Sequence, residues 1–455
     1  MDEKLSETKE EEPEKNRKWH GIFGVGYKLL QVYLFLFVFF ISICAFYWGT
    51  YFHRFGRFKN LELLVVSDDI SFTTSNGTEV RPLIYDSLRD MFTNNETINR
   101  LGDWRYMSTS EISELASKHN SSNYDEVVRQ VHHQKYWAAF YIAPNSTQLI
   151  YESMVNQNVS LIESQAIDQL ITCVYESGRH YSALSQYVTK NLYLILDTWT
   201  SYYGGSKVYN PLVSEILTRD ERSDLMQSEN GTTIINDKPM MRLFDNRPSS
   251  SPSILGPSEL GLIYAQMFSF HQFNLSVEVY SFLRKNLKYK HFVIWRIIAA
   301  NVNCFILALI YSLITIAFRT PIDVAFGKAG FLVLWMFMYL FIVASASINE
   351  LVGTIIMFSG QKQWIPVWLV SYLIFNISVT FSPLELSPRF YRYGYVMPMF
   401  NGYEALKVVF FNTWKGHLGR NIGILIIWIV VMSILMSIIA VYVDKKVKKA
   451  SQKTK

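Results

Sequence analysis

The sequence predicts a polytopic α-helical membrane protein with six transmembrane helices and an α/β extracytoplasmic domain inserted between helices 1 and 2. Three observations support this prediction. An apolar segment lies near the N-terminus, a long segment rich in glycosylation acceptors follows it, and five more helical segments crowd into the last third. With 50% apolar and 18% charged residues, the 455-residue chain has the composition of a membrane block joined to one soluble domain.

The first predicted transmembrane helix comprises residues 29–48, which contain no charged side chain. At about 1.5 Å per residue this segment spans a hydrocarbon core about 30 Å thick. It is too long for the apolar region of a signal peptide and no small-residue cleavage site follows it, so we expect an uncleaved signal anchor. The basic residues Lys15, Arg17 and Lys18 place the preceding tail, residues 1–28, in the cytoplasm.

Residues 49–257 are predicted to be extracytoplasmic and glycosylated. Such modification needs an Asn-x-Ser/Thr acceptor on the lumenal side of the secretory pathway. Six acceptors lie in this segment, at Asn76, Asn95, Asn120, Asn145, Asn158 and Asn230. Two further acceptors, Asn274 and Asn376, fall inside predicted helices and should stay unmodified.

The same segment alternates strand and helix patterns, which predicts an α/β domain. Buried strands are expected at 61–66 and 137–142, and helices at 82–92, 166–175 and 181–196. Its only cysteine is Cys173, so no disulfide can form within the domain, which must be held together by its apolar core.

Residues 258–443 are predicted to form five transmembrane helices with an outer hairpin at 382–420. The helix at 259–282 is only moderately apolar. The basic residues 284–290 that follow it should be cytoplasmic, however, so the chain has to cross the membrane to reach them. The remaining helices are expected at 292–318, 331–352, 365–381 and 422–443, and the basic tail, residues 444–455, is then cytoplasmic.

Polar side chains inside these helices are candidate functional residues, because polarity in hydrocarbon is costly. His271, Asn274 and Glu278 form one stripe on the second helix, Arg296 and Asn303 form another on the third, and Glu350 lies in the fourth. One interpretation is contact between helices, with Arg296 paired to Glu278 or Glu350. The other is a path for a polar substrate or ion.

The outer hairpin combines prolines with an aromatic belt. Its candidate residues are Pro383, Glu385, Pro388, Phe390, Tyr391, Tyr393, Gly394, Tyr395 and Pro398. The prolines prevent one straight helix, and aromatic rings favour the membrane interface. We therefore expect short helices at 388–411, lying in the outer leaflet against the extracytoplasmic domain. They would serve either as a structural cap or as a gate that contacts substrate.

Motifs of enzymes and cofactor sites are missing from the sequence. It has no Walker-type phosphate loop, no His-Glu-x-x-His, no Cys-x-x-Cys and no Gly-x-Ser-x-Gly. We expect no enzymatic activity, no cofactor and no metal site. The net charge of +5 is concentrated beside apolar helices, which indicates membrane orientation rather than binding to nucleic acid.

Three segments carry a resemblance to a known family. They are Pro-Leu-Glu-Leu-Ser-Pro-x-Phe-Tyr-x-Tyr-Gly-Tyr-x-x-Pro at 383–398, Gly-Phe-x-x-x-Trp at 330–335 and Gly-Pro-x-Glu-x-Gly-Leu-Ile-Tyr at 256–264. The chain resembles the fungal nitrosoguanidine-resistance membrane protein family. Its layout is also similar to the bacterial phage-infection-protein family and to membrane subunits of type-2 ABC exporters. The resemblance implies a role in resistance to drugs or mutagens.

Two functions are therefore expected as alternatives. The first is a type-2 ABC-exporter-like membrane subunit that contributes to export of, or resistance to, toxic compounds. Since the chain has no nucleotide-binding domain, its partners besides the lipid bilayer would be a separate ABC ATPase or a second copy in a homodimer. The second is a non-transporting regulator or scaffold that affects lipid distribution or other transporters. We expect the plasma membrane, with the endoplasmic reticulum or another secretory membrane as the alternative.

Overall fold

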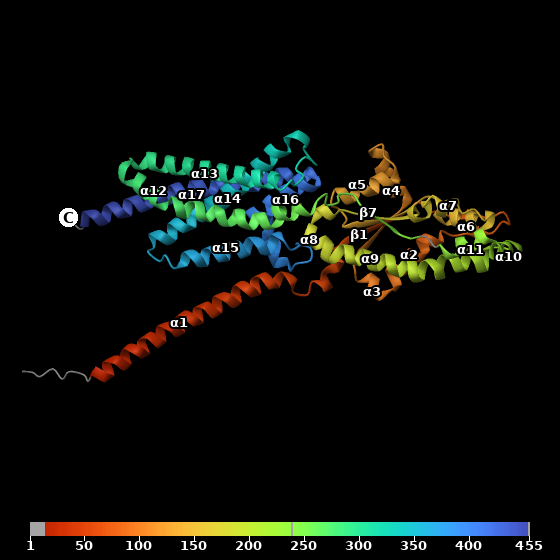
Figure 1. Ribbon diagram of the computed structural model, residues 1–455, viewed down its shortest axis with the longest axis horizontal. Helices are drawn as coiled ribbons and strands as arrows, with labels where there is room; N and C mark the ends of the chain where they lie inside the picture. Colours follow the sequence, from red (N-terminus) through yellow and green to blue (C-terminus); the bar gives the residue numbers. More distant parts are fainter. Residues whose placement is uncertain (1–13, 238–239, 454–455) are drawn as a thin grey trace, which may run out of the picture.

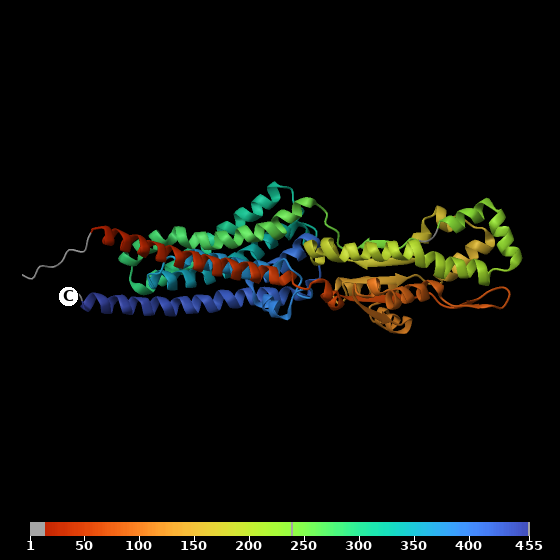
Figure 2. The same cartoon turned by 90° about the horizontal axis from the view of Figure 1, so that it is seen from below.

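The computed structural model describes residues 14–237 and 240–453, which form a sheet domain and a helical block arranged along one long axis (Figure 1). The C-terminal end of the chain lies at the end of the block away from the sheet domain (Figure 2). Residues 1–13 of the predicted tail 1–28, and residues 454–455 of the tail 444–455, lie outside the described residues.

The sheet domain lies between α1 and α12 in sequence and contains a mixed five-stranded sheet in the order β4-β1-β5-β6-β7. Its strands are β1 (Glu62–Ser67), β4 (Asp103–Met107), β5 (Ala138–Ile142), β6 (Ile171–Tyr175) and β7 (Arg242–Asp245). The pairs β1–β4, β1–β5 and β6–β7 are parallel, whereas β5–β6 is antiparallel. A separate ribbon pairs β2 (Phe72–Thr73) with β3 (Glu79–Val80).

Helices cover both faces of this sheet. On one face Phe140 packs against Phe92 in a core that also contains Trp199, and on the other face Ala139, Leu64 and Val127 belong to a second core. The helices are α2 (Leu83–Asn94), α3 (Glu96–Asn99), α4 (Thr109–Lys118), α5 (Asn123–His132), α6 (Ser146–Asn156), α7 (Ser160–Glu163), α8 (Tyr181–Ala183), α9 (Thr189–Thr198), α10 (Arg219–Gln227) and α11 (Glu229–Asn236).

The prediction of a helix at 166–175 is wrong. A short helical turn occupies Ala166–Gln169, and the following residues form β6. Ile171, Thr172 and Val174 are β-branched, and their stiff side chains favour a strand that is buried on both faces. The helix expected at 181–196 does form and continues through π-helical turns to Ile216.

The helical block contains α12 (Gly261–Asn286), α13 (Tyr289–Ala317), α14 (Gly330–Phe358), α15 (Trp364–Thr380), α16 (Pro398–Phe411) and α17 (Leu418–Lys453), with α1 (Glu14–Trp48) beside it. Within the described residues, four helical segments are long and apolar enough to cross a membrane: 25–51, 290–317, 327–358 and 415–442. The helix α15 is apolar but shorter, and α12 does not meet the same criterion. The N-terminal half of α1 diverges from the block (Figure 1).

The helix α14 is the centre of this block, because it packs against α12, α13, α16 and α17. Its small residues Ala344, Ser345 and Ala346 are buried, and they allow close approach of neighbouring helices. The short helix α16 lies between the block and the sheet domain. Apart from Glu404, every side chain of α16 is buried.

Candidate functional site

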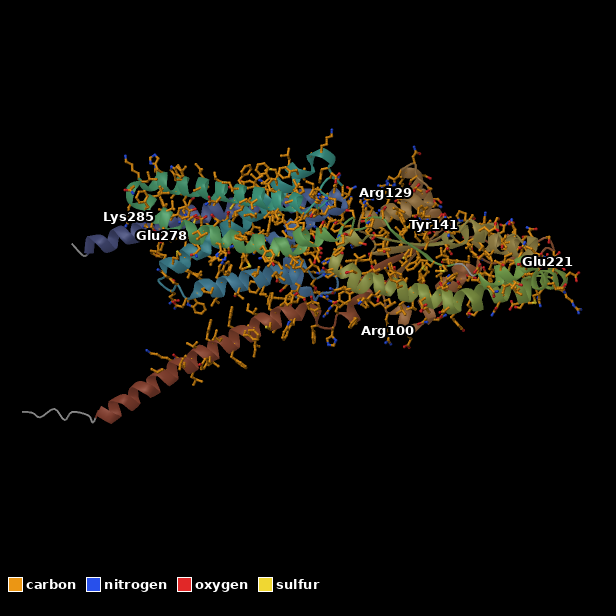
Figure 3. The ribbon with its side chains drawn as sticks, viewed as in Figure 1. Arg100, Arg129, Tyr141, Glu221, Glu278 and Lys285 are labelled. Atoms are coloured by element: carbon orange, nitrogen blue, oxygen red, sulfur yellow. The ribbon has the colours of Figure 1, made fainter. Side chains whose placement is uncertain are left out.

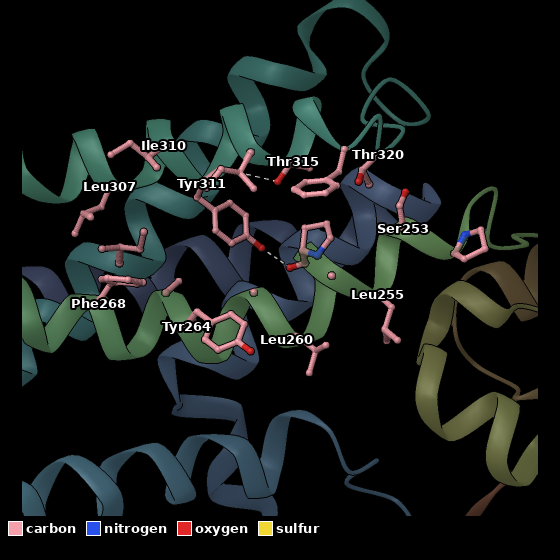
Figure 4. Close-up of a pocket in the computed structure, with 18 residues that line it drawn as sticks. Ser253, Leu255, Leu260, Tyr264, Phe268, Leu307, Ile310, Tyr311, Thr315 and Thr320 are labelled. Carbon is pink, nitrogen blue, oxygen red and sulfur yellow. Dashed lines mark hydrogen bonds between the residues drawn. The ribbon is translucent and has the colours of Figure 1, made fainter.

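A lateral groove between α12 and α13 is the largest cavity we describe in this molecule, with a volume of about 790 Å³ (Figure 4). It lies in the half of the block beside the sheet domain. One wall is formed by residues 252–268, from the turn before α12 and the first part of this helix. The other is formed by residues 307–320 of α13 and the loop that follows.

Two apolar ridges flank the groove. Leu260, Tyr264 and Phe268 follow one another at intervals of four residues along the start of α12, and all three are exposed. On α13, Ile310, Ile314 and Phe318 have the same spacing and are exposed as well. Residues four apart share one face of a helix, so each set forms a continuous ridge.

The floor of the groove is built from small residues and one tyrosine. Gly256, Gly261 and Ala265 line it. A Cβ added at Gly256 would meet open space, whereas one added at Gly261 would lie 2.8 Å from the Tyr311 hydroxyl, so of these two glycines only Gly256 leaves room for a larger side chain. The Tyr311 hydroxyl donates a hydrogen bond to the Pro257 carbonyl and so ties the two walls together at the base (Figure 4).

One end of the groove is polar. Thr320 is 4% exposed, and its Oγ1 has no hydrogen-bond partner among the described residues. From Leu307 to Phe318 the helix advances about 16 Å at about 1.5 Å per residue, close to half the thickness of a hydrocarbon core of about 30 Å. The groove therefore has the length and lining to hold one extended apolar chain, with a hydroxyl at the end near the sheet domain.

A polar network inside the block was not predicted. The Ser345 hydroxyl donates to Gln266 Oε1 at 3.1 Å, and Asn349 Nδ2 donates to Ser269 Oγ at 3.1 Å. The indole of Trp368 donates to Asn349 Oδ1 at 3.1 Å. These contacts join α12, α14 and α15. The spacing of polar residues along α12 is a signal that could have revealed them.

Arg296 and Glu350 form an ion pair inside the block, as expected for one of the two candidate carboxylates. The Arg296 guanidinium also donates to the Thr354 hydroxyl at 2.7 Å, and its carbon lies 5.1 Å from the centre of the Tyr280 ring. Burial in an apolar environment makes such a pair costly unless its other donors find partners, and the contact with Thr354 supplies one of them.

The stripe predicted on the second helix faces outward. Asn274 and Glu278 are exposed, and His271 is half-buried. Glu278 lies in the half of α12 away from the sheet domain, towards Lys285 (Figure 3). Asn303 is directed towards Gln272 instead, at 3.4 Å. Hence α12 meets other helices through polar residues outside the predicted stripe, among them Gln266, Ser269 and Gln272.

The outer hairpin folds into two short helices, Arg389–Val396 and α16. Tyr391 donates to the Phe46 carbonyl of α1 at 2.5 Å, and Tyr393 donates to the Phe375 carbonyl of α15 at 2.8 Å. Among the other predicted residues, Pro383, Gly394 and Pro398 are buried, Glu385 and Pro388 are half-buried, and Phe390 and Tyr395 are exposed. The hairpin thus joins α1 and α15 under the sheet domain.

The six predicted acceptor asparagines all lie in the sheet domain. Asn76, Asn120, Asn145, Asn158 and Asn230 are exposed. Asn95 is half-buried, and its side chain accepts hydrogen bonds from Thr97 and Ile98 at the start of α3.

Comparison with known proteins identifies a family and a membrane-protein relative. The family model for "Protein of unknown function (DUF3533)" matches residues 32–434. A Saccharomyces cerevisiae protein, named as an uncharacterized endoplasmic reticulum membrane protein, is 28% identical over 406 residues, which cover 88% of this chain and 77% of the relative. No solved structure matches the chain significantly. This chain is a helical membrane protein. Since the family model matches most of its length, the chain belongs to the family described as "Protein of unknown function (DUF3533)".

Proposed function

We propose that this membrane protein takes up apolar or amphipathic compounds from the bilayer through the lateral groove and contributes to their export or to resistance against them. The observation that carries the proposal is the groove, which is apolar along its length and has a buried hydroxyl at one end. Because it opens sideways, a compound dissolved in the bilayer reaches it without passing through water. The resemblance to nitrosoguanidine-resistance proteins supports the same role.

The proposal includes a topology with six crossings, by α1, α12, α13, α14, α15 and α17. Basic residues gather at the end of the block away from the sheet domain, where Arg284 and Lys285 lie in the last turn of α12 and Lys288 follows it. Acceptor asparagines gather at the opposite end. The positive-inside rule then places the sheet domain outside the cytoplasm and the groove in the adjacent leaflet.

Partners are part of the proposal, because this chain carries no ATPase motif. The exposed polar residues Asn274 and Glu278 of α12 would lie in hydrocarbon, where a second polar helix stabilises them. We propose that either a second copy of this chain or the membrane-associated part of a separate ABC ATPase packs there. Purification in mild detergent, followed by mass measurement of the complex, distinguishes these two partners.

The proposed location is the endoplasmic reticulum, the alternative to the plasma membrane. The name of the yeast relative supports it, since that protein is described as an endoplasmic reticulum membrane protein. Glycans that stay sensitive to endoglycosidase H, together with a tag that co-localises with a reticulum marker, would agree with this location. Glycans that become resistant would favour a later compartment.

The alternative function is a non-transporting regulator of lipid distribution. Its support is the polar network of Gln266, Ser345 and Asn349, whose members hydrogen-bond to side chains of neighbouring helices rather than line an aqueous path. A regulator would alter the distribution of lipid between leaflets without moving the toxic compound. Efflux of a fluorescent amphiphile from cells, measured beside the exposure of lipids at the surface, separates the two functions.

A growth assay tests the groove directly. Gly256 lines the groove, and a Cβ added there would meet no atom within 4 Å, so Gly256→Phe should fill the space without disturbing the fold. The matched control is Gly423→Phe on α17, which also points into open space but lies outside the groove. In cells that lack the endogenous protein, we expect Gly256→Phe to lower the tolerated concentration of amphipathic toxicants severalfold. Equal resistance in both variants would contradict the proposal.

A further inference from the structure

A second cavity, which we call the junction cavity, lies where the sheet domain meets the helical block and has a volume of about 160 Å³. Arg179 reaches it from the sheet domain, Lys407 from α16 and Arg420 from the start of α17. Glu385 and Glu404 also line it. The side chains of this cavity therefore carry more positive than negative charge.

Two of the three cations are held in place by their neighbours. Lys407 is 3% exposed, and its Nζ donates to the Arg179 carbonyl at 2.6 Å and contacts Glu404 Oε1 at 2.6 Å. The Arg179 guanidinium stacks over the Trp137 ring at 3.9 Å and donates to the Tyr136 carbonyl at 2.7 Å. These groups are preorganised, so a ligand would not have to order them.

The third cation stands at the edge of the cavity and is less constrained. Arg420 is exposed, its Nε donates to Asn421 Oδ1 at 3.3 Å, and its guanidinium lies 5.6 Å from the centre of the Tyr395 ring. Within the described part of the chain, these contacts leave its two terminal nitrogens available. A half-buried imidazole, His417, lies beside it on the cavity wall.

A buried imidazole, His180, has a strongly lowered pKa. Burial is the main cause of this pKa of about 3, and the charges of Lys407 and Arg54 are a lesser cause. This imidazole also lines the cavity and is therefore neutral at physiological pH. The positive charge that opposes its protonation attracts an anion to the same space.

We propose that the junction cavity binds a phosphate-type oxyanion, supplied either as free phosphate or as the phosphate group of a lipid at the adjacent membrane surface. Guanidinium, ammonium and imidazole N–H groups are the donors that phosphate oxygens prefer. The cavity volume of about 160 Å³ is several times the roughly 30 Å³ that one water occupies in the liquid, so the cavity has room for a phosphate group. Glu385 and Glu404 oppose the anion and limit its affinity.

Titration of the purified full-length protein with inorganic phosphate tests the proposal, with sodium chloride at equal ionic strength as the reference. Because a charge-assisted hydrogen bond is lost, we expect Arg420→Gln to weaken phosphate binding about tenfold. Glu385→Gln removes a negative charge and should tighten binding severalfold. The matched control, Arg389→Gln, changes an exposed arginine of the same hairpin that does not line the cavity.

The source of the phosphate is distinguished in nanodiscs kept in phosphate-free buffer. Their lipid is phosphatidylcholine, whose phosphodiester is neutralised by choline, with or without phosphatidic acid, whose phosphate monoester is not. Thermal stabilisation by phosphatidic acid that Arg420→Gln diminishes and Glu385→Gln increases would identify a lipid headgroup. Stabilisation by inorganic phosphate with the same pattern would identify the free ion. The proposal is overturned if neither ligand binds saturably, or if Arg420→Gln and Arg389→Gln bind alike.

Discussion

The charge of Arg296 requires a carboxylate partner inside the helical block. An unpaired charge among apolar helices is expensive, so the sequence alone indicated a carboxylate nearby. Which carboxylate it would be depended on the rotation of α12. Since this rotation turns Glu278 outward, the partner is Glu350 of α14.

Removal of one member of this pair should destabilise the protein strongly. Arg296→Met leaves Glu350 buried without a partner, a change that costs about 3–5 kcal/mol in measured cases. The double variant Arg296→Met, Glu350→Leu should recover most of the loss, because no charge is then left unpaired. Thermal unfolding in detergent measures both, with Glu278→Gln as an exposed control. An Arg296→Met protein as stable as this control would refute the argument.

His180 should make the protein sensitive to acid. Its pKa is lowered to about 3 in the folded state, mainly by burial, whereas an unfolded histidine titrates near 6.5. Between these values the unfolded state binds the extra proton, so the free energy of unfolding falls as the pH falls, by at most about 1.4 kcal/mol per pH unit.

The measurement for this prediction is the free energy of unfolding between pH 7 and pH 4. His180→Gln should flatten the dependence on pH, whereas His53→Gln, which changes an exposed histidine, should leave it as in the parent protein. An unchanged slope in His180→Gln would show that other groups cause the acid sensitivity.

At the scale of elements, apolar periodicity located α12, α13 and α15 to within a few residues. It did not predict that α1 begins at Glu14 or that α17 continues to Lys453, beyond the expected segments 29–48 and 422–443. Prolines located the break before α16. The pattern failed where burial on both faces removes any periodicity, as in β6, which was taken for a helix. The expected position of 388–411 in the outer leaflet stays a prediction. What the pattern did not reveal is that α16 is buried by protein, and that Leu386, earlier in the hairpin, inserts into the core of the sheet domain.

The tight packing of the hairpin makes one glycine irreplaceable. A Cβ at Gly394 would lie 2.7 Å from the Val379 Cβ of α15, closer than real atoms approach. Gly394→Ala should therefore lower the yield of folded protein and its melting temperature. Gly419→Ala is the control, because a Cβ there meets nothing within 4 Å. Size-exclusion profiles of detergent extracts measure the yield, and normal profiles for both variants would disprove this packing argument.

At the scale of the whole molecule, charge and acceptor asparagines predicted how the chain is divided between a sheet domain and a helical block. The lateral groove could not be predicted in this way. It depends on the distance between α12 and α13, which is set by Gly261, where an added Cβ would lie 2.8 Å from the Tyr311 hydroxyl, and by the contact of Tyr311 with Pro257. No local pattern encodes such a distance.

The proposed topology predicts where glycans attach. Glycosidase treatment should lower the apparent mass of the protein from cells, and replacement of the exposed Asn76, Asn120 or Asn158 should remove one glycan each. Replacement of Asn274 or Asn376 should change nothing, since both lie in helices of the block. A glycan on Asn274 would place α12 outside the membrane and overturn the scheme of six crossings.

The central claim, that the lateral groove holds an apolar chain from the bilayer, is tested most directly by photo-crosslinking. Full-length protein in nanodiscs would be irradiated with a phospholipid that carries a photoreactive acyl chain, and the adducts mapped by mass spectrometry. We expect adducts enriched on residues 260–268 and 310–318, lost in Gly256→Phe and retained in Gly423→Phe. Adducts spread evenly over the exposed faces of α1, α13 and α17, and unaffected by Gly256→Phe, would contradict the account.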